Sequence, residues 1–97
     1  MRLTSSQKDL LKQLIDLTRK DACFPREVDI ARRLDADRCI QQLRSMARKG
    51  YVEQCGPRGP WKAIRDDQDY GLIWEFEGNV VSLQRRGPNG IRYRLPD

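Results

Sequence analysis

The chain has 97 residues, of which 38% are hydrophobic and 34% charged, and its net charge is +5. This length suits one small domain and leaves little room for an enzyme cleft in addition to a scaffold. No apolar run approaches the roughly 20 residues of a membrane-spanning helix, and the first ten residues lack the apolar core of a signal peptide. We therefore expect a folded cytoplasmic protein with no membrane partner.

Positive charge is concentrated in arginine and in two parts of the chain. Arginine makes up 14 of the 19 basic residues, and its planar guanidinium suits phosphate groups and guanine edges. Residues 1–65 carry 15 basic and 8 acidic side chains, residues 66–79 carry 5 acidic and no basic ones, and residues 80–97 carry 4 basic and 1 acidic. This distribution favours a nucleic-acid partner; a solvated arginine-rich surface is the competing interpretation.

Residue types that support catalysis or bind metals are scarce. Histidine is absent, and Cys23, Cys39 and Cys55 are odd in number and too widely spaced for a disulfide framework or a close zinc pair. We predict reduced thiols that mostly pack in the interior, and a redox role for them stays open. The acidic segment 66–69 is typical of a polar linker. We expect no enzyme activity, no catalytic residue, no metal and no cofactor.

The first predicted element is a helix over residues 5–19. Thr4 and Gln7 match the Ser/Thr-x-x-Glu/Gln capping pattern, in which each side chain satisfies a backbone N–H of the other residue. The apolar residues that follow recur at spacings of three and four, so one face of the helix is expected to enter the core. These residues are Leu10, Leu11, Leu14, Ile15 and Leu17.

Two shorter helices are predicted next. Pro25 interrupts the first pattern, and a helix over 26–34 follows, with an apolar stripe of Val28, Ile30, Ala31 and Leu34. Asp37 is a plausible N-cap for a third helix over 38–49, and Gly50 is the expected left-handed stop. Its inward residues are predicted to be Ile40, Leu43, Met46 and Ala47.

Beyond residue 50 the apolar period changes to two, which predicts strands. A hairpin is expected from 51–55 and 61–65 around a Gly-Pro-Arg-Gly-Pro tip, with Trp61 more typical of the core than of a stacking site. Two further hairpins follow, one turning at Gly78-Asn79 and one at the second Gly-Pro-x-Gly stretch, 87–90. Trp74 and Phe76 alternate with glutamates, so we expect them to form a core or dimer contact.

The stretch REVDIARRLDADRCIQQLRSMARKGYVEQ, residues 26–54, resembles the helix-turn-helix of bacterial winged-helix regulators. The segments LTSSQKDLLKQLIDL and FPREVDIARRL are similar to the DNA-binding domain of the LexA repressor family. The resemblance covers about residues 3–65. It implies an α+β fold, a three-helix winged helix-turn-helix over 1–65 with a β-hairpin wing at 55–61. Residues 66–97 are then an acidic connector and a small C-terminal antiparallel β extension packed on the same domain.

The resemblance further implies a sequence-specific double-stranded DNA-binding transcription regulator of bacterial or phage type. Its recognition helix 38–49 would enter the major groove, where arginine reads guanine and glutamine reads adenine. The predicted base contacts are Arg38, Gln41, Gln42 and Ser45. The predicted phosphate or wing contacts are Arg33, Arg44, Arg48, Lys49, Arg58 and Lys62.

Other functions remain open at this point. The same fold serves as a protein-interaction module, for instance a subunit or inhibitor in a mobile-element or defence complex, using the acidic strip 66–77 or the 38–49 face. RNA binding or replication initiation would use exposed aromatics such as Trp74 and Tyr93. A homodimer would place DNA half-sites about one helical turn, roughly 34 Å, apart. Whether the hairpin at 87–90 reaches DNA also stays open.

Overall fold

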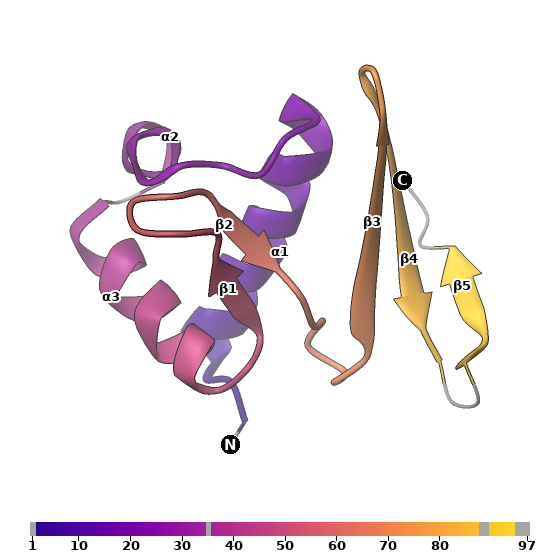
Figure 1. Cartoon of the computed structure of the whole chain (residues 1–97). Helices are drawn as coiled ribbons and strands as arrows, with labels where there is room; N and C mark the ends of the chain where they lie inside the picture. Colours follow the sequence, from indigo (N-terminus) through magenta and orange to yellow (C-terminus); the bar gives the residue numbers. More distant parts are fainter. Residues whose placement is uncertain (1, 35, 88–89, 95–97) are drawn as a thin grey trace.

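The computed structural model describes residues 2–34, 36–87 and 90–94, and the side chains of residues 36–38 lie outside the described part. Within these ranges three helices are followed by two small antiparallel sheets, so the chain is α+β (Figure 1). None of the described helices is both long enough and apolar enough to cross a membrane. The helices are α1 (Ser5–Asp21), α2 (Glu27–Arg33) and α3 (Ala36–Arg48). The strands are β1 (Val52–Gln54), β2 (Trp61–Ala63), β3 (Gly71–Glu77), β4 (Val80–Arg86) and β5 (Arg92–Arg94).

Helix α1 begins with the predicted capping box. Gln7 N donates to Thr4 Oγ1 at 3.2 Å, and Thr4 N donates to Gln7 Oε1 at 3.1 Å. The helix extends two residues beyond its predicted end and stops where Ala22 takes a left-handed φ of 55°. Its predicted apolar face is confirmed: Leu10, Leu11, Leu14 and Leu17 are buried, and Ile15 packs against them.

Helix α2 is one residue shorter at each end than predicted, and its apolar stripe was predicted too wide. Ile30 is fully buried and Leu34 is half-buried, whereas Val28 is 53% exposed and Ala31 is also exposed. A helix of seven residues makes about two turns and presents only a narrow face to the core. Val28 and Ala31 fall outside that face, so their apolar character does not bury them.

Helix α3 begins at Ala36, so the prediction that Asp37 is its N-cap is wrong: Asp37 lies in the first turn. Ala36 has the highest intrinsic helix propensity of the residue types, which favours its inclusion in the helix. The inward face is confirmed, because Leu43 and Met46 are buried and Ile40 and Ala47 pack beside them. The stop is also confirmed: Gly50 has a φ of +88°, and Tyr51 N donates to Met46 O at 3.0 Å.

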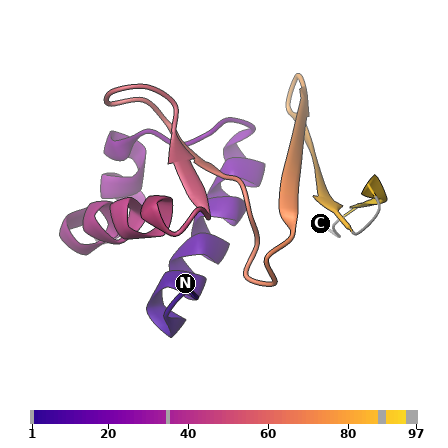
Figure 2. The ribbon, with the colours of Figure 1, turned by 60° about the horizontal axis from the view of Figure 1, so that its bottom comes forward.

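The predicted first hairpin is present but has short strands. Val52 pairs with Ala63 and Gln54 pairs with Trp61. The connection between α1 and α2 lies along the other edge of β2, because Trp61 N donates to Pro25 O at 2.8 Å. Trp61 is 2% exposed and belongs to the core, as predicted. Figures 1 and 2 show α2 and α3 at one end of the molecule, β3–β5 at the other, and α1 with β1–β2 between them.

The second sheet has the order β3-β4-β5, and β3 turns into β4 at Gly78, as predicted. In the turn at 87–90, Pro88 and Asn89 lie outside the described residues. One face of this sheet packs on the core through Leu72 and Leu83, and Trp74 Nε1 donates to Ala63 O at 2.7 Å. Phe76, on the same face as Trp74, is 38% exposed and makes an edge-to-face contact with Phe24.

The acidic segment that follows β2 makes ordered polar contacts, and the interpretation of Asp66 as part of a solvated polar linker is wrong. Asp66 is buried, and its Oδ1 accepts hydrogen bonds from Gln68 N and Tyr70 N. Its Oδ2 lies 2.6 Å from Arg85 Nε, an ion pair. The Tyr51 hydroxyl donates to Asp69. These polar contacts tie the segment to β4 and to the residue that precedes β1.

Candidate nucleic-acid interface

The outward face of α3 carries two exposed amides, Gln41 and Gln42, and two guanidinium groups. Gln41, Arg44 and Arg48 are exposed, and Leu43 and Met46 bury the opposite side of the helix. Because α3 makes more than three turns, these three side chains extend over about 10 Å of its length. An α-helix of this size fits the major groove of B-DNA, and amide and guanidinium groups are the side chains that most often read base edges there.

Three predicted contact residues of α3 and its C-terminal end make hydrogen bonds to α1, and of these Gln42 is also exposed. Gln7 Nε2 donates to Gln42 Oε1 at 2.9 Å and to Ser45 Oγ at 3.2 Å. Lys49 Nζ donates to Gln7 Oε1 at 2.7 Å and to Arg2 O at 3.1 Å. Gln7 is 3% exposed, so its amide is a buried polar group whose hydrogen bonds hold α1 to α3.

Sequence reasoning assigned Gln7 to the helix cap alone and missed this second role. The cap uses the Gln7 backbone N–H and its Oε1, which leaves Nε2 free to donate elsewhere. No spacing rule links residue 7 to residues 42–49, because the contact spans more than 30 positions. Ser45 is consequently half-buried, and reading a base with Gln42 or Ser45 would disturb the contact between α1 and α3.

The predicted wing is a loop over 55–60 with a tight turn at its tip. Gly59 N donates to Gly56 O at 3.0 Å, Pro57 occupies the first central position, and Arg58 has a φ of +58° at the second. This is the pattern of a type II turn, in which the second central residue takes a positive φ and is usually glycine. Arg58 is exposed at the tip. Gly59 is required sterically, because a Cβ there would lie 1.8 Å from Cys55 O.

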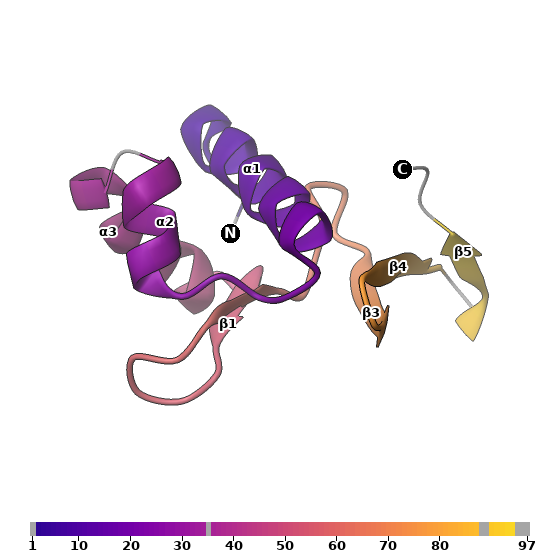
Figure 3. The ribbon, with the colours of Figure 1, turned by 90° about the horizontal axis from the view of Figure 1, so that it is seen from above.

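The base of the loop is fixed to both β1 and α2. Cys55 N donates to Pro60 O at 2.9 Å, and Gln54 Nε2 donates to Glu27 Oε1 at 3.2 Å and to Gly59 O at 3.3 Å. Figures 1 and 3 show the loop extending toward the end of the molecule that α2 and α3 occupy, away from β3–β5. The Arg58 tip and α3 therefore belong to the same end of the molecule.

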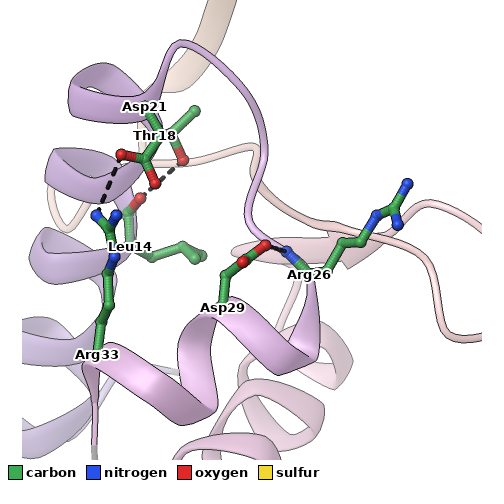
Figure 4. A network of polar contacts seen from close by, with 6 residues as sticks. All are labelled: Leu14, Thr18, Asp21, Arg26, Asp29 and Arg33. Atoms are coloured by element: carbon green, nitrogen blue, oxygen red, sulfur yellow. Dashed lines mark hydrogen bonds and ion pairs between the residues drawn. The ribbon is translucent and has the colours of Figure 1, made fainter.

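The remaining predicted contacts are engaged elsewhere or lie outside the described residues. Arg33 Nη1 is 3.1 Å from Asp21 Oδ1, an ion pair that joins the ends of α2 and α1 (Figure 4). The Lys62 ammonium lies 5.6 Å from the centre of the Phe24 ring, a cation–π contact. The side chain of Arg38 is outside the described part. By contrast, the structure records no ion pair for Arg44, Arg48 or Arg58 with any described residue.

The prediction that the cysteines mostly pack in the interior is wrong for two of them. All three are reduced; Cys39 is half-buried against the core, whereas Cys23 and Cys55 are exposed. Cys23 and Cys55 both lie in loops, and loops run over the surface of a protein. No group of three or more potential metal ligands occurs among the residues that the structure describes.

No protein-family model, curated protein or solved structure matches this chain.

Proposed function

We propose that this chain binds double-stranded DNA as a winged helix-turn-helix and acts as a sequence-specific transcription regulator. The observation that carries the proposal is the grouping of exposed cations at one end of the molecule. Arg44 and Arg48 extend from α3 and Arg58 from the loop tip, without ion pairs among the described residues. Cations without protein partners are the groups that phosphates neutralise on binding.

Within this proposal the α3 residues divide into two roles. Gln41 and Arg44 lie one turn or less apart on the exposed face, so we assign base readout to them. Arg48, at the end of α3, and Arg58, at the loop tip, are assigned to phosphates, which position a protein without specifying sequence. Gln42, Ser45 and Lys49 fix the angle of α3 through Gln7. Arg38 stays a base contact proposed from sequence alone.

Arg33 and Lys62 take a smaller part in the proposed complex. Arg33 would have to leave Asp21 to reach a phosphate, but an exposed ion pair is worth little, so the exchange is cheap. Lys62 faces the Phe24 ring and lies behind the loop tip along the chain. We therefore expect substitutions of these two residues to weaken DNA binding less than substitution of Arg58.

The test measures binding to a mixed-sequence duplex pool by fluorescence anisotropy across a salt series. For the parent protein, log Kd should rise with log salt, with a slope of about 0.9 per phosphate contacted. Arg58→Asn removes the charge and keeps a residue that tolerates a left-handed φ. It should lower the slope by about 0.9 and leave the melting temperature near that of the parent.

The matched control is Lys12→Gln, which removes one positive charge from the exposed surface of α1. Figure 3 shows α1 on the other side of the molecule from the 55–60 loop. Lys12→Gln should therefore leave the slope unchanged. Equal slopes for Arg58→Asn and Lys12→Gln would show that the loop does not contact DNA, and an absence of duplex binding at low salt would refute the proposed function.

A further inference from the structure

The outer face of the β3–β5 sheet is defined by its strand register. Trp74 pairs with Leu83 and Leu72 pairs with Arg85, and these residues lie on the face that packs against the core. Alternate residues point to the opposite side of a sheet. The outer face therefore consists of Ile73, Glu75, Glu77, Val80, Ser82, Gln84, Arg86, Arg92 and Arg94.

Charge on this outer face is separated into two patches. At one end Arg86 pairs with Arg92, and Arg94 pairs with Gln84 in the next row. At the other end, beside the β3–β4 turn, are Glu75 and Glu77. Like charges directly opposite one another destabilise a sheet, so nothing in the sheet itself accounts for the arginine pair. The one recorded contact between the patches, from Arg92 Nη1 to Glu75 Oε1, is long at 3.9 Å.

The same face has a hollow and a buried acceptor. The hollow has a volume of about 220 Å³ and lies between the two patches, lined by Glu75, Glu77, Val80, Ser82, Gln84 and Arg94. Gln84 Oε1 is buried, yet no described residue donates a hydrogen bond to it. A buried carbonyl oxygen without a donor is unfavourable, and a donor brought by a partner would satisfy it.

We infer that the outer face of the β3–β5 sheet binds a second copy of this chain, forming a symmetric dimer. A twofold axis that lies in the face, perpendicular to the line joining the patches, sets each arginine patch against the glutamate patch of the other copy. Symmetric contacts of this kind are the commonest protein–protein association. The exposed Val80 at the acidic end of one face would lie against the aliphatic stems of the arginine patch of the other copy.

The area of the outer face is small for a protein–protein interface. Three strands of at most seven residues cover roughly 300–500 Å² per copy, well below the ~800 Å² of a standard interface. An interface of this size is typical of a weak dimer, which should be sought at several hundred micromolar protein and low salt. Because opposed surface charges hold it together, salt at about 0.5 M should weaken it at least tenfold.

The test uses sedimentation equilibrium of the whole chain, without DNA, so that its outcome is independent of the proposed function. Glu75→Lys with Glu77→Lys makes the outer face uniformly positive, and Arg92→Glu with Arg94→Glu makes it negative at its basic end. Each double variant alone should stay monomeric, whereas an equimolar mixture of the two should form heterodimers. Circular dichroism checks that both variants keep the parent secondary structure.

The matched control is Asp9→Lys with Asp16→Lys, which makes the same change in net charge on exposed positions of α1. This control should dimerise nearly as strongly as the parent. A parent chain that remains monomeric at 500 μM in low salt, or a dimer that both outer-face variants form as well as the control, would overturn the inference. If the charge variants do not fold, the salt dependence of the parent dimer tests the inference. A parent dimer whose dissociation constant does not change with salt would contradict the proposed charge pairing.

Discussion

At the scale of single residues, the tip of the 55–60 loop combines a strained residue with a sterically required one. Arg58 holds a left-handed φ of +58°, a conformation that costs a residue with a Cβ about 1 kcal/mol or more. Glycine would adopt it freely, so a side chain at this position carries a local conformational cost. In our account the guanidinium group compensates for that strain by contacting phosphate.

Gly59, the next residue, tests the geometry of the turn. In Gly59→Ala the new Cβ would lie 1.8 Å from the Cys55 carbonyl oxygen, so the turn must open. We expect urea denaturation to show a loss of about 1–3 kcal/mol in unfolding free energy. The control Gly71→Ala, whose Cβ would meet only Arg86 Cβ at 3.9 Å, should be within about 0.5 kcal/mol of the parent. Equal losses for both would mean that the turn differs from this geometry.

Tyr51 gives the protein a specific sensitivity to alkaline pH. Its hydrogen bond to Asp69, its burial and the Asp69 charge all raise the pKa of the Tyr51 hydroxyl above the ordinary value of 10.0. The protonated form is therefore favoured in the folded state. Its contribution to stability is fully present below about pH 10 and is lost as the pH rises through the folded-state pKa.

Tyr51→Phe should accordingly be less stable than the parent at pH 8 and should lose less stability between pH 9 and 11.5. Chemical denaturation at a series of pH values measures both quantities. The difference between the two proteins should shrink steadily above pH 10, since the phenylalanine has no proton to lose. Parallel stability curves over this range would show that the Tyr51–Asp69 contact does not affect titration.

At the scale of elements, Gln7 sets how α1 and α3 meet. Its buried amide donates to Gln42 and Ser45 and accepts from Lys49, in addition to capping α1. Gln7→Ala should cost about 1–3 kcal/mol of unfolding free energy, because Gln42, Ser45 and Lys49 lose their hydrogen-bond partner at once. Gln13→Ala, at an exposed position of the same helix, should cost less than about 0.5 kcal/mol in the same denaturation assay. A similar cost at both positions would count against the Gln7 network.

Local patterns in the sequence predicted most of the helices and strands. They could not predict polar contacts between residues that are far apart in the chain. The capping box, the Gly50 stop and the Gly78 turn are encoded within a few residues, and all three are present. The burial of Asp66 against Arg85 is not encoded locally, because 19 positions separate the two residues. An Asp-rich segment is also typical of a linker. For the same reason, sequence could not predict that Gln42 and Ser45 bond to Gln7, which lies 35 and 38 positions away.

At the scale of the whole molecule, the two proposed surfaces lie at opposite ends. One end carries α3 and the 55–60 loop, and the β3–β5 end carries the face proposed for self-association (Figure 1). A dimer formed there would hold its two α3 helices apart on the far sides of the assembly. We therefore expect paired half-sites to be separated by more than the one helical turn that compact dimers use.

In the proposed complex, α3 reads DNA sequence while the 55–60 loop contributes affinity. The most direct test of this claim is selection of bound sequences from a random duplex pool, performed with the parent chain, Gln41→Ala and Arg58→Asn. The parent should enrich a defined motif, Gln41→Ala should change the preferred base at one or two positions of it, and Arg58→Asn should bind the unchanged motif more weakly. The absence of any enriched motif, or an identical motif and affinity for all three proteins, would contradict the claim.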